Sequence, residues 1–173
     1  MLTYLLMIIA AVACALFIRV FLFEIAFVKG NSMQPTLRPK EALFVNALAY
    51  KLGKPQRHDI VICHYPGRYM RQLPFIPQQF VKRVIGLPGE TVEIIDGVVH
   101  INGEPLDEPY LDARHTKFRQ NRSPVTLGED EYYVMGDNRD NSNDSRRIGP
   151  LKRSMIIGRV QAVLLPFSRF GKP

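Results

Sequence analysis

The chain has 173 residues, a length that suits one domain of moderate size. Hydrophobic residues make up 46% of it and charged residues 23%, ordinary globular values that exclude disordered, collagen-like and mucin-like proteins. The formal net charge of +7 indicates an anionic neighbour, either nucleic acid or acidic lipid.

The amino-terminal segment is the first predicted element. Residues 1–18 carry no charged side chain, and the apolar run resumes after Arg19 through Phe23. A helix that spans the lipid needs about 20 mostly apolar residues, and Arg19 can extend to the headgroups from the helix end. The sequence therefore predicts a single transmembrane anchor over residues 1–23, followed by one domain over residues 24–173.

Two other interpretations of this segment stay open. The small residues Ala11 and Ala13 suit the cleavage site of a secretory signal, although the chain lacks a basic start and the apolar run continues past Ala13. A buried core helix is the second alternative. The side of the membrane is also open, because 22 of the 23 Lys and Arg residues follow Arg19, yet long domains cross largely regardless of their charge.

Short β-rich runs broken by turn residues follow the anchor, with no internal repeat and no long helical periodicity. Asp96-Gly97 and Asn102-Gly103 are hairpin signals, and the 13 prolines argue against a helical bundle. Residues 65–79 and 106–127 are predicted to be loops or insertions. The fold class is thus mainly β, an antiparallel β-sheet domain behind a single N-terminal transmembrane helix. The predicted strands cover residues 25–28, 42–46, 60–65, 80–85, 91–95, 98–101, 131–135 and 155–165.

The histidines and cysteines indicate no metal site. Two cysteines are too few for a disulfide framework or a zinc ribbon. Cys63 and His64 are neighbours on a predicted strand, so their side chains leave opposite faces and form no nucleophilic pair. We predict neither a metal nor a cofactor. The four histidines, none at metal-ligand spacing, are His58, His64, His100 and His115.

Three stretches are unusual for a small β-domain. Residues 30–37 read GNSMQPTL, which taken alone is a turn. Residues 80–90 read FVKRVIGLPGE and place two adjacent cations in an apolar strand, so alternation turns one of them inward unless the strand is an edge. Residues 136–146 read GDNRDNSNDSR, too polar for a core, and lack the glycine and glutamate that a calcium loop requires.

Together, the three stretches resemble the motifs of type I signal peptidases, membrane-anchored serine proteases that remove signal peptides. They occur in the family order, from the anchor nearly to the carboxyl end. The resemblance implies that Ser32 is the nucleophile and Lys82 the general base. It also implies that Ser142 and Asp144 support the lysine, while Arg146 balances the charge of Asp144.

The chemistry of a Ser/Lys pair is consistent with this resemblance. A neutral lysine can replace histidine as the base that activates a serine hydroxyl. Lowering a lysine pKa from about 10.4 to about 7–8 requires about 4 kcal/mol, which burial can supply. The Ser32 backbone N–H would be one oxyanion donor. The second donor stays open among a backbone N–H, Asn31 and a water, because Gly30 stands where some members have a serine.

The resemblance further implies a single-pass protein of the cell membrane with its catalytic domain on the trans side. Its substrates would be secretory precursors, cut after small residues at −1 and −3. Apolar residues within 22–27 and 69–80 could then enter the bilayer surface, and the positive charge would face anionic lipids. A basic solvated surface is an equal alternative. Nucleic acid is not an expected partner, because no basic motif interleaved with aromatic residues stands out.

Three other functions are alternatives to this one. A membrane Ser/Lys peptidase that matures pilins would share the dyad and the anchor. A self-cleaving repressor would need a helix-turn-helix domain, and the sequence has none. A catalytically inactive, membrane-tethered binding module would have little reason to keep both Ser32 and Lys82.

Overall fold

The computed structural model describes residues 3–12, 23–71, 73–117 and 120–173. Residues 3–12 form a helix with exposed side chains. Among the described residues, no helix has both the length and the apolar character that crossing a membrane requires. Residues 1–2 and 13–22 of the predicted anchor over residues 1–23 lie outside the described residues, so the transmembrane helix stays a prediction.

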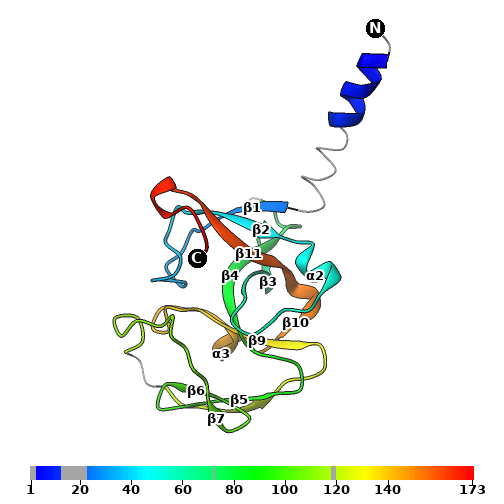
Figure 1. The fold of residues 1–173 in the computed structure, drawn as a ribbon. Coiled ribbons are helices and arrows are strands. Elements are labelled where there is room, and N and C mark those ends of the chain that lie inside the picture. Colours follow the sequence, from blue (N-terminus) through cyan, green and yellow to red (C-terminus); the bar gives the residue numbers. More distant parts are fainter. Residues whose placement is uncertain (1–2, 13–22, 72, 118–119) are drawn as a thin grey trace.

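Antiparallel strands dominate the rest of the chain, which confirms the mainly β class (Figure 1). The larger sheet has the order β1-β2-β11-β3-β4-β9-β10, and each neighbouring pair is antiparallel. Its strands are β1 (Phe23–Phe27), β2 (Ala42–Asn46), β3 (Ile60–Tyr69), β4 (Pro77–Gly86), β9 (Glu131–Met135), β10 (Leu151–Lys152) and β11 (Ile156–Leu165).

A smaller antiparallel sheet has the order β7-β6-β5-β8 and lies below the larger one in Figure 1. Both predicted hairpin turns are confirmed, because Asp96-Gly97 joins β5 to β6 and Asn102-Gly103 joins β6 to β7 with positive φ angles throughout. The strands of this sheet are β5 (Thr91–Ile95), β6 (Val98–Ile101), β7 (Glu104–Pro105) and β8 (Arg122–Thr126). Four short helices complete the described fold: α2 (Ala49–Leu52), α3 (Ser145–Ile148), η1 (Arg153–Met155) and η2 (Phe167–Arg169).

The two predicted loops contain more strand than expected. β3 continues to Tyr69 and β4 begins at Pro77, and these two residues are paired, so the turn of this hairpin is confined to residues 70–76. The prolines are tolerated because the ladder is irregular between His64 and Tyr69. In the second range, residues 122–126 form β8, an edge strand that can accept its proline.

Buried apolar side chains form clusters that fix the loop after β1. Met33 and Leu37 are fully buried and pack with Leu43 and Val45 of β2 and with Ile62 of β3. The Leu37 backbone N–H donates to the Met33 carbonyl at 2.8 Å, which closes a tight turn. Residues 30–37, which taken alone are a turn, are therefore anchored in the core through the buried Met33 side chain. This anchoring holds the adjacent Ser32 in place.

Candidate active site

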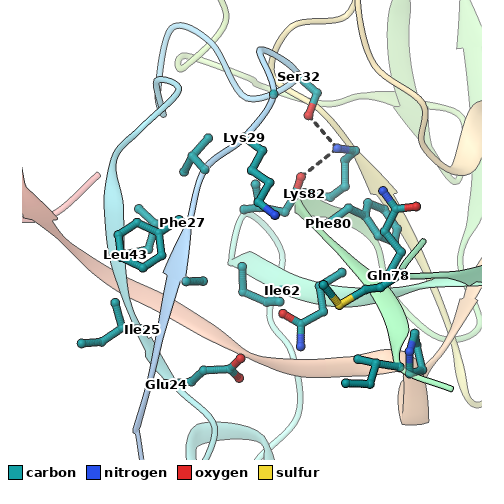
Figure 2. Close-up of a pocket in the computed structure, with 18 of the residues that line it drawn as sticks. Glu24, Ile25, Phe27, Lys29, Ser32, Leu43, Ile62, Gln78, Phe80 and Lys82 are labelled. Atoms are coloured by element: carbon teal, nitrogen blue, oxygen red, sulfur yellow. Dashed lines mark hydrogen bonds between the residues drawn. The ribbon is translucent and has the colours of Figure 1, made fainter. Parts of the chain in front are cut away.

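Lys82 and Arg83 of β4 are both buried, with 3% and 7% of their surface exposed. Neither is therefore the solvent-facing cation of an edge strand. Lys82 reaches Ser32, since its Nζ lies 2.8 Å from Ser32 Oγ and also donates to the Val81 carbonyl at 2.8 Å (Figure 2). The Lys82 ammonium lies 5.1 Å from the centre of the Phe80 ring. The two residues named by sequence as nucleophile and base are thus hydrogen-bonded partners.

The surroundings of Lys82 favour its neutral form. Burial lowers the pKa of Lys82 to about 8, although the carboxylates of Asp144 and Asp137 act in the opposite direction. An ordinary lysine would be almost fully protonated at this pH. A substantial fraction of Lys82 can therefore accept a proton from the Ser32 hydroxyl near neutral pH.

Arg83 lies on the opposite face of β4 and has structural partners. Its Nε and Nη2 donate to the two carboxylate oxygens of Asp137 at 2.9 and 2.6 Å, and its Nη1 donates to the His58 carbonyl at 3.0 Å. The guanidinium also stacks 3.8 Å from the centre of the Tyr110 ring. Asp137 in turn accepts from Thr36 Oγ1, so one carboxylate joins β4 to the loop that carries Ser32.

The polar stretch over residues 136–146 contacts the backbone of Ser32 directly. The Asn138 N–H donates to the Ser32 carbonyl at 3.0 Å, and Asn138 Nδ2 donates to the Asn31 carbonyl at 3.2 Å. At Gly136, a Cβ would lie nearer than 3.0 Å to both the Ser32 carbonyl oxygen and Ser142 Oγ. Sequence reasoning missed both contacts, since it assigned this stretch to the lysine alone.

Asp144 and Arg146 form a buried ion pair within the same stretch. Arg146 Nε and Nη2 donate to the two Asp144 oxygens, each at 2.8 Å, and the Gly136 N–H donates to Asp144 at 3.0 Å. Burial would raise the pKa of Asp144, but the Arg146 guanidinium and the Gly136 N–H lower it overall. Asp144 is thus a fixed negative charge that acts on Lys82.

Ser142 lies against Gly136, and its buried hydroxyl acts on Asp144, whose pKa it helps to lower. The predicted support of Lys82 by Ser142, Asp144 and Arg146 stays a prediction. Asp144 lies close enough to Lys82 for its negative charge to raise the pKa of the lysine.

Glu108 and Arg139 are a further buried pair that sequence reasoning missed. Their side chains form a two-point ion pair, and Arg139 Nε also donates to the Gly136 carbonyl at 3.2 Å. Tyr110 donates its hydroxyl to Glu108 at 2.6 Å. No local signal could have found this, because the pair joins an irregular, basic region to a distant polar loop.

A cleft of about 800 Å³ leads to Ser32 and Lys82. Residues 24–30, which include β1, line one side of it, and residues 76–82, which include most of β4, line the other. Figure 2 shows Glu24 at the end of the cleft opposite Ser32 and Lys82. Leu43 and Ile62 contribute to its apolar lining.

The histidines and Cys63 lie outside this arrangement. None of the histidine contacts found among the described residues involves Ser32 or Lys82. Burial raises the pKa of the Cys63 thiol to about 12, so the thiol is not an alternative nucleophile. Over the described ranges, no three or more His, Cys, Asp or Glu side chains form a group that could hold a metal ion. Cys14 lies outside the described residues.

Known proteins match the chain over most of its length. The family model for "Signal peptidase, peptidase S26" matches residues 1–165. Signal peptidase I of Bacillus licheniformis is 40% identical over 173 residues, which cover 95% of this chain and 89% of that protein. Signal peptidase I of Leptolyngbya laminosa is 39% identical over 162 residues, covering 94% and 78%.

The fold also resembles a solved structure. The crystal structure of a signal peptidase I from Enterococcus faecalis V583 matches with a TM-score of 0.51 and 35% sequence identity. The match covers 62% of this chain and 97% of that one. With a family model that spans nearly the whole chain and relatives near 40% identity, the chain belongs to the signal peptidase family, peptidase S26.

Proposed function

We propose that this chain is a signal peptidase I that cleaves secretory precursors after small residues at −1 and −3, with Ser32 as nucleophile and Lys82 as general base. The observation that carries the proposal is the 2.8 Å contact between Ser32 Oγ and the buried Lys82 Nζ. Family membership supports a serine peptidase, and it does not favour a pilin-processing enzyme or an inactive binding module.

The reaction follows from the two side chains. Neutral Lys82 accepts the Ser32 proton as Ser32 Oγ attacks the scissile carbonyl carbon. Lys82 then gives this proton to the leaving amine, which leaves an acyl-enzyme on Ser32. A water, deprotonated by Lys82 in the same way, hydrolyses the ester and releases the signal peptide. The Ser32 backbone N–H is one donor to the oxyanion, and Gly30 offers no hydroxyl as a second.

We assign supporting roles to the polar stretch. The buried Ser142 hydroxyl acts on the Asp144 carboxylate, so we assign it to supporting Lys82 through Asp144. Asp144 raises the pKa of Lys82, which opposes its burial and keeps the pKa near 8 rather than lower. Arg146 neutralises Asp144 and keeps its carboxylate in one orientation.

The cleft suits an extended peptide. β1 is the outer strand of the larger sheet, and β9 pairs with β4 only at residues 83–86, so both walls offer unpaired backbone edges. A peptide can add to such edges as a strand. In an extended peptide the side chains at −1 and −3 point to the same face, so one apolar wall selects both. Leu43 and Ile62 belong to that wall, and we assign to it the selection of small side chains.

A membrane surface near the cleft agrees with the predicted localisation, a single-pass protein of the cell membrane with its domain on the trans side. Ile25 and Phe27 on β1 and Tyr69 and Phe75 near the tip of the β3–β4 hairpin are all more than half exposed. Apolar side chains at this density suit the interface of a bilayer. Sedimentation with anionic and neutral vesicles distinguishes this lipid contact from the alternative, a solvated basic surface. The protein sediments with the vesicles only if it binds lipid.

The test is cleavage of a secretory precursor by the full-length chain in detergent. We expect cleavage after the signal peptide, no cleavage by Ser32→Ala or Lys82→Ala, and weaker cleavage of a pilin precursor. Circular dichroism confirms that each variant is folded. Cleavage by folded Ser32→Ala at the wild-type rate would exclude the proposed nucleophile.

A further inference from the structure

Asn138 donates hydrogen bonds to the two peptide groups on either side of Ser32. Its backbone N–H donates to the Ser32 carbonyl at 3.0 Å, and its side-chain Nδ2 donates to the Asn31 carbonyl at 3.2 Å. These carbonyls belong to the peptide groups that enter and leave the proposed nucleophile. One residue from the polar stretch thus restrains the backbone of Ser32 from both directions.

The orientation of the Asn138 amide is fixed by its other contact. Its Oδ1 accepts the Asn141 backbone N–H at 3.1 Å, which directs the NH2 group to the Asn31 carbonyl. The residue is buried, with 6% of its surface exposed. The same carbonyl also accepts the Gln34 N–H at 3.2 Å. The Asn31 carbonyl therefore has two donors that hold it in place.

This contact sets the direction of the Ser32 N–H. The peptide bond between Asn31 and Ser32 is trans, so its C=O and N–H point in opposite directions in one plane. Because the carbonyl is directed at Asn138, the Ser32 N–H is directed away from the polar stretch. Gly30 and Ser32 line the cleft and Asn138 does not. In the described part of the chain, this N–H donates to no other group.

We infer that the Asn138 side chain is a positioning residue for the oxyanion hole: by holding the Asn31 carbonyl, it keeps the Ser32 N–H turned toward the substrate. The inference rests on the proposed function, in which that N–H stabilises the oxyanion. A preorganised donor needs no reorganisation as negative charge develops. Without the Asn138 amide, the Gln34 N–H is the one of these two donors that remains on the Asn31 carbonyl, so the peptide group is less restrained and the Ser32 N–H is misplaced in part of the molecules.

Such a role predicts a specific kinetic pattern. The oxyanion exists in the transition state and not in the bound substrate, so its loss lowers kcat and leaves KM nearly unchanged. Lys82 makes no hydrogen bond with Asn138, so the pH at which the base loses its proton stays the same. Loss of a complete oxyanion donor lowers kcat by about 10²–10³-fold. For Asn138→Ala, which leaves the Ser32 N–H present but less restrained, we expect kcat to fall by about 10- to 100-fold.

The experiment compares the full-length chain in detergent with Asn138→Ala and Asn138→Asp. The aspartate keeps a side-chain oxygen that can accept the Asn141 N–H, and it lacks the NH2 group that donates to the Asn31 carbonyl. It therefore preserves the turn between residues 138 and 141 even if alanine disrupts that turn. Asn121→Ala is the matched control, because this exposed amide lies beside the smaller sheet, where its oxygen accepts the Asp96 N–H. We expect the control to keep the wild-type kcat, KM and pH profile.

A second readout isolates the oxyanion. The probe is a peptide that ends in Ala-Gln-Ala, with its carboxyl group reduced to an aldehyde, and the corresponding peptide alcohol. Ser32 Oγ bonds to the aldehyde carbon, the Ser32 proton passes to Lys82 and the aldehyde oxygen becomes the oxyanion. The alcohol binds without this bond. In Asn138→Ala the aldehyde affinity should fall by the same factor as kcat/KM, and the alcohol affinity should stay within about twofold.

Each affinity refers to the folded fraction, so partial unfolding cannot mimic the result. In Asn138→Ala, equal loss of aldehyde and alcohol affinity or a shifted pH profile would overturn the inference. An unchanged kcat in both Asn138 variants would also overturn it. These outcomes are distinct from failure of the proposed function, which would appear as retained cleavage in folded Ser32→Ala or Lys82→Ala.

Discussion

Arg83 and Asp137 form a buried two-point ion pair on the face of β4 opposite Lys82. Two adjacent cations of one strand therefore have different chemistry because they have different neighbours. Arg83 donates to both oxygens of a carboxylate within hydrogen-bond distance. Among the described residues, the hydrogen-bond partners of Lys82 are the Val81 carbonyl and Ser32 Oγ, and burial lowers the pKa of Lys82.

This pair makes Arg83→Lys a damaging change although the charge is kept. Lysine cannot donate to both Asp137 oxygens in one plane or stack on Tyr110. We expect a loss of about 2 kcal/mol in unfolding free energy, less than the roughly 3–5 kcal/mol for deleting one partner of a buried pair. Urea unfolding measures it. The control is Arg114→Lys on the exposed Arg114–Asp112 pair, which should leave the urea midpoint nearly unchanged because solvent screens this pair. Equal effects at the two sites would contradict a structural role for Arg83.

The pH profile of cleavage should report the lowered pKa of Lys82. The base acts when deprotonated, so kcat/KM should rise with pH, pass half its maximum near pH 8 and level off above. Lys82→Arg should be inactive across pH 5 to 10, because guanidinium does not lose its proton in proteins. His64→Ala and His100→Ala should keep the wild-type profile. A profile centred at pH 6–7 that disappears in a histidine variant would exclude the Ser/Lys mechanism.

Lys82 should also lower the stability of the fold at neutral pH. Its pKa falls from 10.5 in the unfolded chain to about 8 in the folded one, so the unfolded state binds more protons between these values. Stability should therefore rise as pH increases from about 8 to about 10.5. Lys82→Met should be inactive but more stable at pH 7, by up to about 3 kcal/mol. Thermal unfolding at pH 7 and pH 10.5 tests this, and the gain should shrink at the higher pH.

The sequence predicted the two hairpin turns, and it named two residues, Ser32 and Lys82, that the structure brings into contact. Asp96-Gly97 and Asn102-Gly103 specify tight turns by themselves, because few residues adopt positive φ. Ser32 and Lys82 were named because their motifs resemble those of type I signal peptidases, and their catalytic roles stay a prediction. The extension of β3 to Tyr69 was missed because proline and glycine usually end a strand, whereas here they lie where the ladder is irregular.

The parts of the site that sequence did not reveal depend on tertiary placement. Asn138 lies 107 residues from Asn31, and Glu108 lies 31 residues from Arg139. No spacing rule covers such distances, and the irregular region around Glu108 offers no pattern of its own. Gly136 is a similar case. Position 136 requires glycine because the Ser32 carbonyl oxygen lies against it in the folded chain, and the sequence alone does not show this contact.

Gly136→Ala should therefore abolish cleavage. The added Cβ would press on the Ser32 carbonyl and Ser142 Oγ, and the first of these is backbone that cannot move without displacing the nucleophile. We expect a loss of more than about 10²-fold in kcat/KM, comparable to loss of an oxyanion donor. Gly128→Ala is the control, because the nearest atoms to its Cβ belong to the flexible Glu131 side chain at 3.4 Å or more. Wild-type cleavage by folded Gly136→Ala would mean that the polar stretch does not restrain Ser32.

Gly30→Ser should be tolerated and should increase the rate if its hydroxyl reaches the oxyanion. No atom lies within 4 Å of a Cβ at Gly30, and its backbone angle is open to other residues. The side chain would enter the cleft two residues before Ser32. Gly30→Ala separates the added hydroxyl from the added carbon, and we expect it to keep the wild-type rate.

The decisive comparison combines Gly30→Ser with Asn138→Ala. A new hydroxyl donor contributes more when the Ser32 N–H is misplaced, so Gly30→Ser should raise kcat by a larger factor in Asn138→Ala than in the wild type. Precursor cleavage under single-turnover conditions measures the four rates of this cycle. Additive effects would show that the two positions do not serve the same oxyanion. A loss of more than about 10²-fold in Gly30→Ser alone would show that this position requires its glycine.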